Sequence, residues 1–290
     1  MEKYYNKKTR TLTLPYNFNE KLRDLPNGVN KIIFHQKSEY NNYNYNELPN
    51  TITHITYGYK FNNYFNLPIS LTHLTIGSSY SYGKFNLPID KLPKNLIYLE
   101  VGYWFNHPVD KLPNKLTHLI LGTKFNQPVD KLPPNLTHLV LGDCFNQPVD
   151  NLPKNLMRLV LGFNFNQPVD NLPKNLTHLV LGCKFNQPID KLPINLKKLV
   201  LGGSFNYPIY NFPINLEYLS FYCSSNITNI PITVKKIKLY FSKYKYDEKI
   251  TNLPFCLEKL IINDESKLNC IKKIPFGCRI YNMSNTQLFL

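Results

Sequence analysis

Five histidines recur at similar spacings along the chain, and their imidazoles could bind a metal or titrate near neutral pH. Each follows a threonine and precedes leucine or isoleucine; they are His54, His73, His118, His138 and His178. If these segments lie side by side, neighbouring rings would be about 5 Å apart. Zinc needs three or four converging ligands, and no cysteine or acid shares the position. We therefore expect no metal site, and pH sensitivity is the alternative, because stacked imidazoles disfavour double protonation.

Aspartates recur with a period of twenty residues and could bind calcium. They are Asp110, Asp130, Asp150, Asp170 and Asp190. Carboxylates stacked about 5 Å apart repel by roughly 1 kcal/mol even in water, and the adjacent Lys111, Lys131 and Lys191 can offset this. The Gly-Asp-rich spacing of calcium-binding solenoids is missing. We interpret the aspartates as structural corner residues.

Catalytic signatures are absent from the sequence. There is no nucleophile–base pair at a fixed spacing, no phosphate-binding glycine loop and no cofactor motif. Cys144 follows Asp143, but repeat geometry brings only the His138 position near it. The sequence therefore predicts neither an enzyme nor a cofactor.

The spacing of all these residues comes from an internal repeat. Phe-Asn pairs stand twenty residues apart and begin at Phe85, Phe105, Phe125, Phe145, Phe165, Phe185 and Phe205. Leu-Pro pairs keep the same period, and the central unit reads L-P-x-N-L-T-H-L-V-L-G-x-x-F-N-Q-P-V-D-K. A fixed period of this length indicates a solenoid, in which stacked repeats share one core.

Within one repeat, the segment from 136 to 142 predicts a short β-strand. Leu139 and Leu141 share one face and His138 and Val140 the other. The repeated phenylalanines should stack in the core, and the two repeated asparagines should satisfy backbone groups at the corners. The 22 prolines would interrupt most helices. We predict an all-β, leucine-rich-repeat-like solenoid with a parallel sheet on its concave face.

The repeat extends beyond the regular block. We expect about thirteen coils, mostly of twenty residues, from near residue 9 to near residue 283. Five extra residues lie within Ser78–Lys84. The predicted organisation is a single solenoid domain over 1–290, with irregular repeats in 1–84, regular repeats in 85–213 and degenerate repeats with a cap in 214–290.

Charge and composition limit the function classes. The net charge of +15 is spread evenly, because 1–91, 92–213 and 214–290 each carry five more basic than acidic residues. The local exception is Lys235-Lys236-x-Lys238, near Lys259 of the next coil, which we interpret as part of a solvated cap. Nucleic-acid or other polyanion binding is the alternative function.

No apolar run is long enough to span a membrane. The start lacks a signal peptide, and six cysteines without paired spacing indicate a reduced, cytoplasmic protein.

The repeat resembles the FNIP repeat family, a relative of the leucine-rich repeats. The match rests on Leu-Pro-x-x-Leu and on Phe-Asn-x-Pro-Val/Ile, as in Phe105–Val109 and Phe125–Val129. The resemblance implies a protein of amoebae or of their large DNA viruses, in the latter case one of the host cytoplasm. Family members often carry an N-terminal F-box that links a bound target to a ubiquitin ligase. The first coil begins near residue 9, so we expect no F-box in this chain.

Two sets of positions predict a protein-binding surface on the concave face. An outward apolar stripe usually marks an interaction site, although β-branched residues also simply favour strands. Aromatic residues in the variable slots after the strands are typical of binding hot spots. The candidates, including the neighbouring outward column, are Tyr103, Trp104, Lys124, Asp143, Phe163, Lys184, Ile120, Val140, Val160, Val180, Val200, His118, His138, Arg158 and His178. The sequence therefore predicts a module that binds a host or cellular protein. Self-association through the valine stripe is a further alternative, and the oligomeric state stays open.

Overall fold

The protein is described by a computed structural model, whose described residues form two compact units, Met1–Gln147 (unit 1) and Pro148–Leu290 (unit 2). The described residues are 1–22, 24–38, 48–64, 66–77, 83–223, 227, 229–241 and 250–288. The repeat sequence continues unchanged through the boundary between Gln147 and Pro148.

Unit 1 is a β-solenoid in which each coil contributes one strand. Its strands are β1 (Tyr5–Asn6), β2 (Thr11–Leu14), β3 (Lys31–Phe34), β4 (His54–Tyr57), β5 (His73–Ile76), β6 (Tyr98–Val101), β7 (His118–Leu121) and β8 (His138–Leu141). From β2 to β8 each strand pairs in parallel with the next in chain order. The short β1 pairs antiparallel with β2 after a 3-10 turn at Glu2–Tyr4.

Unit 2 has the same organisation. Its strands are β9 (Arg158–Leu161), β10 (His178–Val180), β11 (Lys198–Val200), β12 (Tyr218–Tyr222), β13 (Lys236–Tyr240), β14 (Lys259–Ile262), β15 (Arg279–Tyr281) and β16 (Gln287–Leu288). Strands β9 to β15 are parallel in chain order, and β16 pairs antiparallel with β15. A 3-10 helix at Glu265–Cys270 precedes β15.

The predicted alternation of strand side chains is confirmed. In β8, Leu139 and Leu141 are buried in the core, whereas His138 and Val140 are partly exposed on the other face. The register places like positions opposite one another, as in the pairs Leu119–Leu139 and His118–His138. The all-β, parallel-sheet solenoid predicted from the sequence is therefore the observed fold, with about twelve turns against the thirteen expected.

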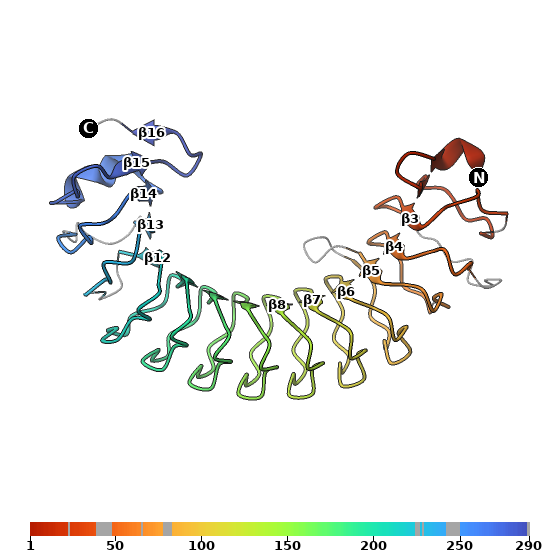
Figure 1. Ribbon diagram of the computed structural model, residues 1–290, viewed down its shortest axis with the longest axis horizontal. Coiled ribbons are helices and arrows are strands. Elements are labelled where there is room, and N and C mark those ends of the chain that lie inside the picture. Colours follow the sequence, from red (N-terminus) through yellow and green to blue (C-terminus); the bar gives the residue numbers. More distant parts are fainter. Residues whose placement is uncertain are drawn as a thin grey trace. The chain divides into compact units, whose positions relative to one another are not determined.

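A phenylalanine spine fills the core opposite the strands, as predicted. In unit 1, Phe105, Phe125 and Phe145 are fully buried, and successive rings stack at 6.1 Å. In unit 2, Phe165, Phe185 and Phe205 repeat this geometry at 6.1–6.2 Å. Parallel strands are only about 4.8 Å apart, so each coil is wider at the phenylalanine than at the strand. Each unit consequently curves toward its strands, which line the inner side of that curve (Figure 1).

Both predicted asparagine ladders are present. The Asn126 Oδ1 accepts the Asn146 backbone N–H at 2.9 Å, and the Asn166 Oδ1 accepts that of Asn186 at 2.8 Å. At the other corner, the Asn135 Nδ2 donates to the carbonyl of the preceding coil at 2.9 Å. Each amide thus bonds a backbone group of the neighbouring coil.

The aspartate corner is ionic, but the pairing runs between coils. Lys131 Nζ lies 3.7 Å from Asp110, and Lys191 Nζ lies 3.7 Å from Asp170, each twenty-one residues earlier. Asn171 Nδ2 also donates to Asp150 at 3.0 Å. The lysines therefore offset carboxylate repulsion as expected, although their partner is the aspartate of the previous coil.

The irregular loop predicted within Ser78–Lys84 lies mostly outside the described residues, since 78–82 are not described. On either side of it the register is intact, because His73 of β5 pairs with Tyr98 of β6.

Candidate functional site

The candidate site is the strand face, defined here as the strand side chains that point away from the core. In each unit these side chains form two columns, because alternate strand residues share a face and like positions pair across strands. In unit 1 the first column comprises Thr11, Lys31, His54, His73, Tyr98, His118 and His138. The second column comprises Thr13, Ile33, Thr56, Thr75, Glu100, Ile120 and Val140.

Histidine rings of the first column stack in pairs in unit 1. The His54 and His73 rings lie 4.1 Å apart between centroids and nearly parallel, and those of His118 and His138 lie 4.2 Å apart. Tyr98 lies between the two pairs, 5.8 Å from His73 and 6.2 Å from His118. The predicted juxtaposition of neighbouring imidazoles is thus confirmed.

The preceding threonine fixes the tautomer of each ring. The Thr137 Oγ1 donates its single hydrogen to the Thr117 carbonyl at 3.1 Å and also lies 2.9 Å from the His138 Nδ1. The ring nitrogen must therefore be the donor in the second contact. Thr53 binds His54 in the same way. Each neutral ring consequently carries its hydrogen on Nδ1, which makes Nε2 the acceptor nitrogen.

Burial and neighbouring charge disfavour protonation of the first histidine pair. The pKa of His54 is lowered by burial, then by His73 and Lys31. The pKa of His73 is lowered by burial, then by His118 and Lys31. These rings are therefore held neutral at pH values at which an isolated histidine would begin to charge.

Glu100 places a carboxylate in the second column of unit 1 and binds its neighbour in the first column. The Tyr98 hydroxyl donates to Glu100 Oε2 at 2.9 Å. The pKa of Tyr98 is raised, first by burial and then by the charge and hydrogen bond of Glu100. The tyrosine therefore stays a neutral hydrogen-bond donor at the centre of this face.

In unit 1, residues at the variable positions just after the strands form an aromatic cluster. This edge of the sheet, where the strands end, is called the rim. Trp104 is 47% exposed, and the Tyr103 ring meets it edge-on at 5.4 Å. Lys124 Nζ lies 5.4 Å from the Trp104 ring and 5.8 Å from the Tyr103 ring. These three predicted residues are brought together. Asp143 is exposed in the equivalent turn of the next coil.

The apolar stripe is less exposed than its sequence suggests. Ile120 and Val140 of unit 1 are only partly exposed, and so are Val160, Val180 and Val200 of unit 2. In the sheet each is flanked by the like residue of the adjacent strand, as in the pair Ile120–Val140. Stacking along the column removes part of each side chain from water, and a ridge of accessible apolar surface remains.

The strand face of unit 2 differs in charge. Its first column comprises Arg158, His178, Lys198, Tyr218, Lys236, Lys259 and Arg279. Its second column comprises Val160, Val180, Val200, Ser220, Lys238, Ile261 and Tyr281. At the rim, Phe163 is 47% exposed and the Lys184 Nζ lies 5.8 Å from its ring. Arg158 and His178, both predicted site residues, belong to this basic column.

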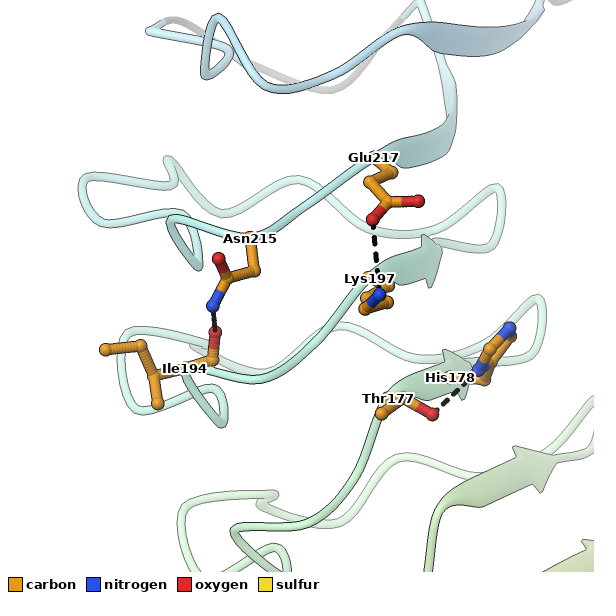
Figure 2. A network of polar contacts seen from close by, with 6 residues as sticks. All are labelled: Thr177, His178, Ile194, Lys197, Asn215 and Glu217. Carbon is orange, nitrogen blue, oxygen red and sulfur yellow. Dashed lines mark hydrogen bonds and ion pairs between the residues drawn. The ribbon is translucent and has the colours of Figure 1, made fainter.

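Polar residues in and beside the column of unit 2 contact one another. Figure 2 shows the Thr177–His178 contact at 2.9 Å and the ion pair between Lys197 and Glu217 at 3.4 Å. It also shows the Asn215 amide bonded to the Ile194 carbonyl on the turn side. The pKa of His178 is lowered by burial and then by Lys198 and Arg158. Lys198 and Arg158 therefore make the surroundings of His178 positively charged, which disfavours protonation of its ring.

The continuity of this basic column is the feature that sequence reasoning missed. Lys236 and Lys238 were expected to share a face near Lys259, but as part of a solvated cap. The register shows that Lys236 follows Tyr218 directly in the column, and that Arg279 follows Lys259. The sequence gives only a weak signal for this column, because from Tyr218 to Arg279 successive members are 18, 23 and 20 residues apart and do not keep the regular spacing of twenty.

Among the described residues, no group of three or more His, Cys, Asp or Glu side chains could hold a metal ion. None of the helices in this part of the chain has the length and apolar character needed to cross a membrane.

Comparison with known proteins identifies the fold and the family. The chain is similar to the crystal structure of CroV588, described as a novel circular leucine-rich-repeat protein, with 33% identity and a TM-score of 0.71 over 88% of this chain. It is also similar to YopM from Yersinia enterocolitica WA-314, with 22% identity and a TM-score of 0.56 over 93% of this chain. The chain spans 44% of the length of the first protein and 59% of the second.

A comparison with curated protein sequences found no match. The FNIP Repeat family model matches residues 44–79, 85–124, 125–162, 145–184, 165–192 and 185–224, which together make up more than half of the chain. The chain therefore belongs to the FNIP repeat family.

Proposed function

We propose that the protein is an interaction module that binds another protein through its strand faces and the rim beside them. The leucine-rich-repeat-like fold commonly mediates protein–protein interaction. The general reason is geometric, because a solenoid curved toward its strands offers an extended inner surface whose side chains vary from coil to coil. The proposal adds a face and a set of residues to that general role.

The observation that carries the proposal is the rim cluster of unit 1 beside its apolar ridge. Trp104 is half exposed although it contacts Tyr103, and a lysine lies against both rings. Tryptophan, tyrosine and arginine are the residues most enriched in binding hot spots. Ile120 and Val140 supply partly exposed apolar surface on the strands. A rigid aromatic anchor beside apolar strand positions is the composition expected of a protein-binding surface.

The test compares two variants of the full chain that carry matched changes in unit 1. The face variant is Trp104→Ala/Ile120→Lys/Val140→Lys. The control variant is Tyr64→Ala/Ile69→Lys/Asn114→Lys, which removes one exposed aromatic and adds two lysines at exposed turn positions. Urea unfolding first establishes that both variants fold, and affinity capture from a cell lysate is then quantified by mass spectrometry.

We expect proteins that wild type and the control variant capture equally to be lost from the face variant. A hot-spot truncation costs about 2 kcal/mol or more, which corresponds to at least about a thirtyfold loss of affinity. Equal capture by both variants would show that the strand face and rim of unit 1 do not bind the captured proteins.

A further inference from the structure

The strand face of unit 2 carries a ladder of cations, interrupted in its first column by His178 and Tyr218. Five of the seven residues in its first column are lysine or arginine, and Lys238 adds a sixth cation in the second column. Neither column contains an acidic residue. The corresponding first column of unit 1 contains one lysine, Lys31. The charge is therefore a property of this face and not of the fold.

Within the described part of unit 2, the acidic side chains that form ion pairs pair with lysines outside the ladder. Among the described residues of unit 2, ion pairs join Lys191 to Asp170, Lys197 to Glu217 and Lys235 to Glu258. None of these lysines belongs to the two columns, and the two glutamates are each engaged by a lysine just before a strand. The pKa of Lys198 is lowered, first by burial and then by Arg158, Lys236 and Lys238. The ladder thus retains unbalanced positive charge.

Lysine ammonium groups lie over the rings of the two tyrosines in the columns, Tyr218 and Tyr281. Tyr218 lies between β11 and β13, and Lys198 and Lys236 from these strands place their ammonium groups 4.8 and 5.4 Å from its ring centroid. Lys259 Nζ lies 3.9 Å from the Tyr281 ring. Single-stranded nucleic acids are usually held by bases that stack on free aromatic faces. Rings that already carry lysine ammonium groups favour a ligand that is recognised by charge and hydrogen bonding.

The spacing of the cations suits an extended polypeptide that crosses the strands. Arg158, Lys198 and Lys236 lie on β9, β11 and β13, so successive members are two strands, or about 10 Å, apart. An extended chain advances about 3.3 Å per residue, and three residues therefore span the same distance. Lys259 and Arg279 follow on β14 and β15 at one-strand steps. A carboxylate at every third position would therefore meet Arg158, Lys198, Lys236 and Arg279, and a continuous acidic run would also reach Lys259.

We propose that the strand face of unit 2 binds an extended, Asp/Glu-rich segment of a partner protein that lies across strands β9 to β15. The guanidinium of Arg158 and the ammonium groups of Lys198, Lys236 and Lys259 bind its carboxylates. The Tyr218 ring supports two of these lysine side chains. The proposal rests on the proposed function and specifies the chemistry of the partner.

The test measures binding of a fluorescein-labelled oligoglutamate of about twelve residues to the full chain at about 0.15 M salt. The ladder variant is Lys198→Gln/Lys236→Gln/Lys238→Gln. The control variant is Lys154→Gln/Lys174→Gln/Lys272→Gln, which removes the same charge from exposed residues outside the columns. An oligothymidylate of equal length and an uncharged oligoglutamine serve as competitors, and urea unfolding verifies that both variants fold.

We expect the ladder variant to bind oligoglutamate about tenfold more weakly than wild type and the control variant to differ from wild type by less than about threefold. Oligoglutamine should not compete. Equal losses in the two variants, or no binding to wild type, would overturn the proposal. Oligothymidylate that binds more tightly than oligoglutamate and depends on the ladder would also overturn it, in favour of nucleic acid.

The failure of this inference and the failure of the proposed function are distinguishable. In one outcome, capture of lysate proteins depends on Trp104, Ile120 and Val140, but the ladder variant binds oligoglutamate as tightly as wild type. In that case only the inference about the acidic segment is wrong. If neither measurement depends on a strand face, the proposed function is wrong as well.

Discussion

Two adjacent glycines show how single positions set the spacing of the coils. A Cβ added at Gly202 would lie 2.5 Å from the Gly182 carbonyl carbon and 2.6 Å from the Cys183 Cα, both of which are backbone atoms. A Cβ added at Gly203 would meet only the Tyr222 side chain, at 3.4 Å. Neither glycine has a positive φ. The first glycine is therefore required by the approach of the neighbouring coil, and the second is not.

We predict that Gly202→Ala destabilises the protein by about 1–3 kcal/mol, because backbone atoms of the preceding coil must shift to make room. Gly203→Ala should change the stability by less than about 0.5 kcal/mol. Urea unfolding of the two variants measures both effects. Similar free energies of unfolding for the two variants would contradict a role for Gly202 in coil spacing.

The twenty-residue period of the sequence predicted the Phe125 and Asn126 columns. It could not supply the atom that each residue contacts. The tautomer of His138 is an example, since it depends on Thr137 donating to the carbonyl of the preceding coil. That contact joins residues twenty positions apart, and its geometry is set by the register of the sheet.

At the scale of elements, strands β4 and β5 bring His54 and His73 into a stack flanked by Lys31 of β3 and Tyr98 of β6. Burial, the neighbouring ring and Lys31 lower both pKa values. Protonation adds charge at Nε2 and leaves the bond from Nδ1 to threonine intact. The pKa shift therefore reflects burial and repulsion within the stack and not a broken hydrogen bond.

A lowered pKa in the folded state means that the unfolded chain binds more protons just below the ordinary histidine pKa of about 6.5. The stability that the neutral rings contribute is present above that pH and is lost as the pH falls through the folded-state pKa. We predict that wild type loses unfolding free energy between about pH 7.5 and about pH 5.5. His54→Gln/His73→Gln should lose less over the same range.

Urea unfolding at a series of pH values measures this difference. Comparison at the highest pH isolates the effect of losing the two threonine contacts, which is independent of protonation. Parallel pH profiles for wild type and the double variant would show that the stacked pair is not responsible for the pH dependence.

The strands also show which part of the candidate site could be predicted. Where repeats are regular, as from β7 to β11, period-two alternation places His138 and Val140 outward, and the register follows from the spacing of twenty. Where repeats are degenerate, register depends on which leucine or isoleucine enters the core. Ile237 of β13 pairs with Leu260 of β14 although they are 23 residues apart and not the twenty of the regular repeats. Lys259 therefore joins the column of Lys236 through packing that spacing alone does not show.

At the scale of the whole chain, the charge is even along the sequence but uneven across the surface. Each third of the sequence has an excess of five basic residues. The position of each basic residue within its repeat determines on which side of the solenoid its charge lies. In unit 2, six basic residues occupy outward strand positions. A count along the sequence cannot detect this pattern, because residues of one column are separated by a full coil.

Concentrated charge that serves binding should reduce stability. Cations about 10 Å apart repel by about 0.4 kcal/mol per pair in water, and the lowered pKa of Lys198 shows that the environment already disfavours its charge. We predict that Lys198→Gln/Lys236→Gln/Lys238→Gln is more stable at low ionic strength than Lys154→Gln/Lys174→Gln/Lys272→Gln, although both variants lose three charges. Salt screens the repulsion over a Debye length of about 10 Å at 0.1 M, so the difference in urea midpoint should shrink as salt is added. A ladder variant less stable than the control at low salt would show that contacts such as those of Lys198 and Lys236 with Tyr218 outweigh the repulsion.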